Sequence, residues 1–132
     1  MTGMATPPQL LVVEDHAGHR TLLDLLLSPS GYDMTMVGDA REALTWLQTH
    51  TPDLVILDVN LPQMTGLQIA DRMRKITRLK DTKIIILTAL HDEGTREMAR
   101  MVKAEALILK PLQGKDFRAT VESVLAGEKI PI

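Results

Sequence analysis

Four short motifs in this sequence carry polar residues of types that together could hold a phosphoryl group and a divalent cation. Acidic residues stand at 14 and 15 in "VVEDH" and at 58 in "VILDVN", a threonine stands at 88 in "IILTAL", and a lysine at 110 in "LILKPL". Each motif begins with an apolar run that should be buried. Burial of a lone charge is costly, so Asp58 needs a chemical reason to end such a run.

The chemistry of these residue types is that of phosphoryl transfer. Carboxylates held close together repel one another, and a nearby cation relieves that repulsion. Mg²⁺ suits the site because it uses one or two carboxylates, several waters and often a phosphate oxygen. Asp58 would then attack phosphorus, Lys110 would bind one phosphoryl oxygen, and the Thr88 hydroxyl could donate to another.

Two kinds of segment alternate along the chain and must position these residues. Short apolar runs rich in β-branched residues predict strands, and stretches with helical spacing and mixed charge predict helices. The predicted strands are 10–14, 32–37, 53–58, 83–88 and 106–110. The predicted helices are 19–28, 40–50, 66–76, 93–103 and 114–127.

This alternation predicts an α/β fold, doubly wound and flavodoxin-like, with five parallel strands. Near-continuous apolar strands are typical of a parallel sheet covered by helices on both faces. One common strand order for open sheets is 2-1-3-4-5, and ligands bind at the carboxyl ends of the strands, where that order reverses. In this order the reversal lies between the first and third strands, which makes Asp15 and Asp58 neighbours.

Length and composition narrow the class of protein. The chain has 132 residues, 45% of them apolar, but only one Trp, one Tyr and one Phe, which predicts one domain with an aliphatic core. A net charge of −2 gives no sign of nucleic-acid binding, and the absence of cysteine excludes disulfides and thiolate metal sites. We expect a flexible tail over 1–8, a domain over 9–127 and a loose end over 128–132.

No segment suggests a membrane or an export signal. No apolar run approaches the roughly 18 residues that a membrane span needs, and "MTGMATPPQ" lacks the charged start and apolar stretch of a secretory signal. We therefore expect a cytoplasmic protein.

In their order and strand positions, these motifs resemble the receiver domain of two-component response regulators. The resemblance covers roughly residues 9–127 and rests on "VVEDH", "LDVNLPQMTG", "LTAL" and "LKPL". It implies that Asp58 accepts a phosphoryl group from a phosphohistidine on a sensor histidine kinase or a histidine phosphotransfer protein. The phosphorylated domain would then bind an output protein differently through the face formed by helix 4, strand 5 and helix 5.

The resemblance also implies a set of Mg²⁺ ligands. Asp15 would ligate the ion directly, together with Asp58 and the backbone carbonyl of Asn60. Glu14 would support it indirectly, for example through water.

Other roles follow from the same resemblance. Thr88 and Lys110 would contact the phosphoryl group, and Pro111 would follow a cis peptide bond. Asn60 and Leu90 occupy the positions that tune how fast water removes the phosphoryl group. Because Leu90 has no polar group to orient water, we expect a longer-lived phosphoaspartate.

One position departs from the family pattern. The family usually has an aromatic residue three positions before the lysine, and this chain has Leu107 there. A leucine can fill such a pocket but cannot repeat the ring rotation that follows movement of Thr88 in the family. We therefore expect intact phosphorylation chemistry with a non-standard readout that runs through Leu107.

Two other functions stay open from the sequence. A degenerate receiver would bind a partner without phosphorylation, which Leu107 allows but the complete set of polar residues argues against. A phosphatase or phosphotransferase acting through an aspartyl phosphate usually has a second Asp two residues after the nucleophile. That position is Asn60, a poor proton donor, so we expect a signalling switch rather than an enzyme.

Several residues near the motifs have plainer interpretations. Glu14 and Asp15 alone could cap the helix that follows them. His16 is more typical of a loop than of a Mg²⁺ site, because Mg²⁺ prefers oxygen ligands. No motif surrounds the other histidines, and no role is assigned to His19, His50 and His91.

The predicted helix 93–103 has two candidate faces. Met98 and Met101 are three positions apart, which favours a buried face. The basic residues near the opposite face are Arg96, Arg100 and Lys103. A role for them in docking a partner is a further hypothesis.

Overall fold

The computed structural model of this chain describes residues 6–90 and 92–132, so His91 and residues 1–5 of the predicted tail lie outside the description. Its strands are β1 (Gln9–Val13), β2 (Asp33–Val37), β3 (Leu54–Asp58), β4 (Lys83–Thr88) and β5 (Ala106–Leu109). Its helices are α1 (Ala17–Leu27), α2 (Ala40–Leu47), α3 (Gly66–Arg74), α4 (Glu93–Met101) and α5 (Gly114–Leu125), with a short 3₁₀ helix over Ser28–Ser30. Every predicted strand and helix is present, with ends that differ by a few residues. Across the described residues, no helix is both long and apolar enough to cross a membrane.

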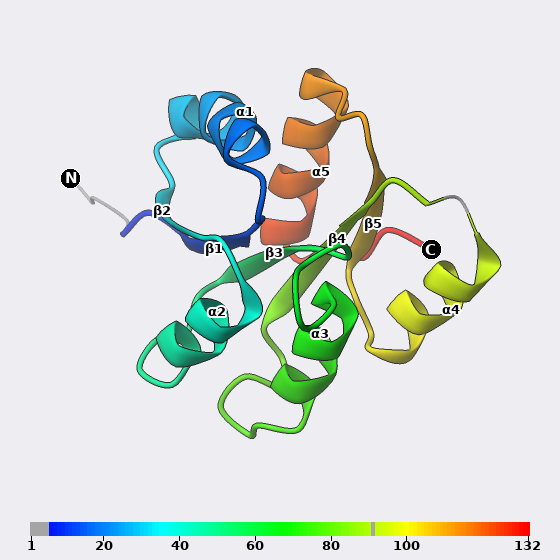
Figure 1. Cartoon of the computed structure of the whole chain (residues 1–132). Coiled ribbons are helices and arrows are strands. Elements are labelled where there is room, and N and C mark those ends of the chain that lie inside the picture. The colour runs from blue at the N-terminus through cyan, green and yellow to red at the C-terminus, as the bar shows by residue number, and fades with distance from the viewer. Residues whose placement is uncertain (1–5, 91) are drawn as a thin grey trace.

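The strands form one parallel sheet in the order β2-β1-β3-β4-β5, which confirms the predicted topology. Val13 of β1 lies beside Leu57 of β3, and the next residue of β3, Asp58, lies beside Leu87 of β4. Figure 1 shows α1 and α5 on one face of the sheet and α2, α3 and α4 on the other. The carboxyl ends of all strands therefore meet along one edge, and the polar residues that follow them meet there too.

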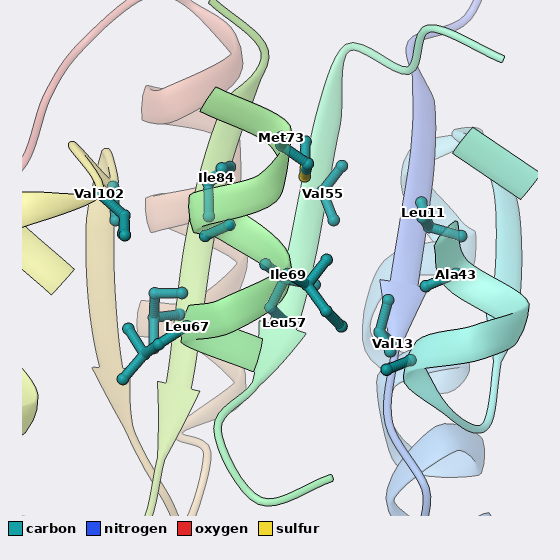
Figure 2. Close-up of a cluster of buried hydrophobic side chains, with 14 of the residues drawn as sticks. Leu11, Val13, Ala43, Val55, Leu57, Leu67, Ile69, Met73, Ile84 and Val102 are labelled. Atoms are coloured by element: carbon teal, nitrogen blue, oxygen red, sulfur yellow. The ribbon is translucent and has the colours of Figure 1, made fainter. Parts of the chain in front are cut away.

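Side-chain alternation along the strands divides the core into two layers. On one face, Val55 and Leu57 of β3 pack with Ile69 and Met73 of α3 (Figure 2). On the other face, the layer that includes Ile56 packs with Phe117 of α5 and with Leu23 and Leu27 of α1. The core is almost wholly aliphatic, as the composition predicted. It packs against both faces of β3 up to Asp58.

Helix α4 buries a different face from the one that the sequence predicted. Its buried side chains are Thr95 and Ala99, and Val102 beyond its end is also buried. Met98 and Met101 are 48% and 71% exposed, so their assignment to the core is wrong. A spacing of three fits either of two neighbouring stripes on a helix, and the smaller side chains occupy the stripe that meets the sheet.

The C-terminal residues lie against the domain, in contrast to the loose end predicted for 128–132. The Ile130 N–H donates to the Glu105 carbonyl at 2.7 Å, beside the start of β5. Arg100 Nη1 donates to the Ile132 carbonyl at 3.1 Å. Ile130 and Ile132 are partly buried on opposite core layers, so apolar contact anchors this short segment along the β5 edge.

Candidate functional site

An open cavity of about 280 Å³ lies at the carboxyl edge of the sheet. It is found where the strand order reverses between β1 and β3, the position that the topology predicts for a ligand. The polar residues that line it are Glu14, Asp15, His16, His19, Asp58, Asn60 and Lys110. The structure therefore brings together the acidic residues and the lysine that the sequence singled out, and adds two histidines.

Asp58 is the last residue of β3, and only 3% of its surface is exposed. Its Oδ1 accepts a hydrogen bond from the Asn60 N–H at 2.8 Å, and its Oδ2 accepts one from Lys110 Nζ. Burial by itself raises the pKa of Asp58, but hydrogen bonds from Glu14, Lys110 and the Asn60 N–H outweigh it and lower that pKa. Asp58 is therefore held as a carboxylate, the form that can act as a nucleophile.

The backbone of Asp58 is fixed from behind by the start of α3. The Thr65 side chain caps this helix by accepting from the Gln68 N–H, and the Gln68 side chain accepts from the Thr65 N–H in return. The next residue is Gly66, where a Cβ atom would lie 2.2 Å from the Asp58 carbonyl oxygen. Only glycine allows this close approach, so the capped helix and the strand end together set the position of the carboxylate.

Glu14 follows β1 directly, is 1% exposed, and faces the same cavity. Its Oε2 lies 3.3 Å from Lys110 Nζ, and its Oε1 lies 2.9 Å from His19 Nδ1. Burial raises the pKa of Glu14, and the neighbouring Asp58 raises it further. Ligand atoms of Glu14 and Asp58 lie within 4.8 Å of one another. Two carboxyl groups this close resist being ionised together.

Lys110 provides the positive charge of the site. Burial lowers its pKa, but hydrogen bonding and attraction to Asp58 and Glu14 outweigh burial and raise it. The ammonium therefore stays charged. Lys110 is followed by a cis peptide bond to Pro111, in the geometry that the resemblance implies.

Asp15 has a different place from Glu14. It is exposed and lines the cavity, and its backbone carbonyl accepts from Arg20 Nη1 at 3.0 Å. Glu14 is the acidic residue that forms a close group with Asp58 and His19, in which ligand atoms lie within 4.8 Å of one another. The direct role of Asp15 in binding an ion, which the resemblance implies, stays a prediction.

Thr88 lies at the end of β4, as predicted, but its hydroxyl is engaged elsewhere. It is 1% exposed, and its Oγ1 accepts from the Leu90 N–H at 2.9 Å. Its carbonyl accepts from the Lys110 N–H at 2.8 Å, which joins the ends of β4 and β5. Thr88 is not among the residues that line the cavity, so contact with a phosphoryl group would require its side chain to turn. Leu90 is 49% exposed.

Leu107 lies one strand away from Thr88. It is partly buried in β5, beside Ile86 of β4, and packs on the core layer that α2, α3 and α4 cover. The structure thus links the predicted readout position to the α4 side of the sheet.

Sequence reasoning missed His19, which the structure places in the first turn of α1. Its Nδ1 lies 2.9 Å from Glu14 Oε1 and 3.3 Å from Lys110 Nζ. The residue that caps α1 is His16, whose Nδ1 accepts from the Gly18 N–H at 3.1 Å and the His19 N–H at 3.4 Å. Glu14 and Asp15 are therefore not the side chains that cap this helix. A helix predicted to begin at residue 17 instead of 19 would have placed His19 in the first turn, at the edge of the sheet.

The donor set of the cavity fits a divalent cation. Two carboxyl groups lie opposite a single ammonium, so the site carries acidic charge that Lys110 alone cannot balance. Carboxylate and carbonyl oxygens, with room for water, are the ligands that Mg²⁺ uses in proteins. The arrangement can hold an ion, keep Asp58 ionised and offer Lys110 to an anionic group.

Comparison with known proteins gives consistent matches over nearly the whole chain. A sequence profile described as the response regulator receiver domain matches residues 10–122. Response regulator Rre1 of Synechocystis sp. is 32% identical over 127 residues, which are 96% of this chain and 55% of that protein. The polar-differentiation response regulator DivK of Brucella anthropi is 31% identical over 119 residues, which are 90% of this chain and 97% of DivK.

Solved structures agree with the fold. The chemotaxis response regulator CheY4 of Vibrio cholerae superposes with a TM-score of 0.84 at 29% identity, covering 90% of this chain and 99% of that one. The chain spans about half the length of several of the curated relatives that it matches, and nearly all of DivK.

Proposed function

Because this chain belongs to the family of response regulator receiver domains, we propose that Asp58 is its phosphoacceptor and that the reaction depends on Mg²⁺. Receiver domains of this family are signalling switches that interact with histidine kinases. The observation that carries the proposal is the pairing of buried Asp58 with Lys110 and Glu14 at an open cavity. A carboxylate so placed is ionised, oriented and reachable by a phosphodonor.

The proposed transfer breaks a P–N bond and forms a P–O bond. The phosphohistidine of a kinase or phosphotransfer protein gives up its phosphoryl group to a carboxylate oxygen of Asp58, and the imidazole leaves. The Asn60 N–H orients the acceptor by holding Oδ1. Lys110 offsets the negative charge that gathers on the phosphoryl oxygens.

Asp15, Asp58 and the Asn60 carbonyl would hold the Mg²⁺ ion directly, with Glu14 supporting it from the buried side of the same cavity. When bound, the ion offsets charge on the carboxylates and on the phosphoryl oxygens. Lys110 now interacts with both Glu14 and Asp58. With the charge of the carboxylates offset by an ion, the ammonium would be free to bind a phosphoryl oxygen.

The switch follows from the charge that phosphorylation adds, about −1.5 to −2 at the end of β3. That charge favours the conformer in which Lys110 and the Thr88 hydroxyl close on the phosphoryl group. The Thr88 hydroxyl accepts from the Leu90 N–H in this structure and keeps its own proton to donate to a phosphoryl oxygen once the side chain turns toward the cavity. A partner senses the change only if it binds the two conformers differently. Leu107, on the strand next to that of Thr88, packs on the core layer that α4 covers.

Intact-mass measurement after incubation with acetyl phosphate tests the proposal. Wild type should gain a phosphate adduct with Mg²⁺ and not with EDTA, and Asp58→Asn should gain none. The matched control is Asp71→Asn, which changes an exposed carboxylate on α3 that pairs with Lys75 away from the cavity, and should behave as wild type. Steady donor turnover without an adduct would favour an enzyme, and neither adduct nor turnover would favour a degenerate receiver.

A further inference from the structure

We propose that His19 makes this a mixed nitrogen and oxygen metal site, which binds a divalent transition-metal ion such as Co²⁺ or Zn²⁺ more tightly than Mg²⁺. The ligands are Glu14, His19 and Asp58, with water completing the shell. The inference rests on the proposed function, because it concerns the same cavity. It adds a cation selectivity that oxygen ligands alone would not give.

The geometry of the three side chains is close to that of a metal site. Their ligand atoms lie within 4.8 Å of one another. Two ligands bound to one ion at about 2.1 Å each can be at most about 4.2 Å apart. His19 Nδ1 and Glu14 Oε1, at 2.9 Å, are already within that limit, and the ligand atom of Asp58 lies within 4.8 Å of the other ligand atoms.

A cation already lies among these three groups, namely the ammonium of Lys110. It is 3.3 Å from His19 Nδ1, 3.3 Å from Glu14 Oε2, and in contact with Asp58 Oδ2. An ammonium can only donate hydrogen bonds, so the two carboxyl groups accept from it, while His19 Nδ1 lies within hydrogen-bonding distance of both Glu14 and Lys110. A divalent ion would displace the ammonium from this point, and His19 would bind it in the tautomer that carries its proton on Nε2.

The fold holds His19 in this place. His16 caps α1 and accepts from the His19 N–H, and the two imidazole rings lie 4.4 Å apart between centroids. These contacts fix the first helical turn beside the end of β1. The His19 side chain is 48% exposed, while Glu14 is 1% exposed. The site therefore has buried oxygen ligands and an open nitrogen side through which an ion can enter.

The ligand chemistry sets the selectivity. Mg²⁺ is a hard ion that strongly prefers oxygen, whereas imidazole nitrogen suits Co²⁺, Ni²⁺ and Zn²⁺. An all-oxygen site gains less from exchanging Mg²⁺ for these ions than a site with an imidazole ligand does. One nitrogen ligand shifts the balance toward them.

Calorimetric titration of the metal-free protein with CoCl₂ and with MgCl₂ tests the selectivity. His19→Ala should weaken Co²⁺ binding by about tenfold or more, a loss typical of disrupting a metal site, and should change Mg²⁺ binding much less. His50→Gln is the control, because His50 stacks on Trp46 away from the cavity. Circular dichroism checks that each variant is folded. Equal Co²⁺ affinity in wild type and His19→Ala would overturn the inference, as would an equal loss for both ions.

A spectroscopic readout identifies the ligand itself. The imidazole protons of His19 should show a large paramagnetic shift with Co²⁺ that is absent in His19→Ala and kept in His50→Gln. A phosphate adduct with Mg²⁺ but no effect of His19 on Co²⁺ binding would overturn this inference alone. Absence of the adduct, with Co²⁺ binding that depends on His19, would overturn the phosphoacceptor role alone.

Discussion

Lys110 lies between two buried carboxyl groups, in contact with Asp58 Oδ2 and 3.3 Å from Glu14 Oε2. The exposed fractions of the two acidic side chains are 4% and 1%. One positive charge therefore faces two acidic groups with little solvent to screen them. Burial raises the pKa of Glu14, whereas hydrogen bonds and the Lys110 charge lower the pKa of Asp58 against burial. The charge imbalance is the reason that the site should attract a second cation.

Loss of the ammonium should destabilise the metal-free protein. Lys110→Met leaves two buried carboxyl groups without their counterion, and we expect the free energy of unfolding to fall by about 2–3 kcal/mol. This is below the ~3–5 kcal/mol of a fully buried pair, because the Lys110 side chain is 18% exposed. Urea denaturation in EDTA measures the change. Mg²⁺ should restore part of the loss, and equal stability of both proteins in EDTA would refute the imbalance.

Replacing Glu14 should change how stability depends on pH. Burial, with Asp58 next, raises the pKa of Glu14, so the unfolded chain releases this proton at lower pH than the folded one. Stability therefore falls as pH rises from the unfolded pKa to the folded pKa. Glu14→Gln removes that fall.

The unfolding free energy of Glu14→Gln relative to wild type should thus increase from about pH 4, near the ordinary glutamate pKa, toward neutral pH. Denaturation in EDTA across this range is the measurement. A difference between the two proteins that stays constant with pH would contradict the raised pKa.

Gly66 should be intolerant of a side chain. In Gly66→Ala the new Cβ atom would lie 2.2 Å from the Asp58 carbonyl oxygen, so α3 or the end of β3 must move. We expect a loss of about 1–3 kcal/mol in stability, as for overpacked sites, and slower adduct formation on Asp58. In the control Gly94→Ala, the Cβ meets Asp92 Oδ1 at 3.4 Å, an ordinary contact. A loss no larger than that of the control would show that the close approach is unimportant.

Leu107 should affect the readout and leave the chemistry alone. Leu107→Tyr restores a ring at the position where the family usually has one, and we expect adduct yield to stay within about twofold because catalysis rests on positioned charges at the cavity. The change in amide hydrogen exchange of α4 and α5 on phosphorylation, and the affinity for the output partner, should differ from wild type. Leu25→Tyr on α1, at a 66% exposed position, is the control. Identical responses in all three proteins would exclude a route through Leu107.

The sequence predicted the topology and the convergence of Asp58 and Lys110, because both follow apolar runs that can only be parallel strands. Once the strand order is known, the shared edge follows without any side-chain detail. The finer positions depended on single residues at element ends. Because β1 ends at Val13, Glu14 faces the cavity from a buried position and Asp15 is exposed. The spacing of residues in the sequence could not decide which of these two acidic residues is buried at the cavity.

The positions of His19 and of the C-terminal segment could not be predicted from the residue pattern either. His19 entered the site because α1 begins at Ala17, two residues before the predicted start. The C-terminal segment lies on the β5 edge through Ile130 and Ile132, whose contacts are with distant parts of the chain. A local pattern carries no information about such contacts.

Borohydride reduction followed by peptide mass mapping tests the central claim most directly, because it converts an aspartyl phosphate to homoserine and so marks the residue that was phosphorylated. After acetyl phosphate and Mg²⁺, we predict homoserine at position 58 and unmodified acidic residues at positions 14 and 15. Homoserine at another position, or equal conversion of position 58 with Mg²⁺ and with EDTA, would contradict the account.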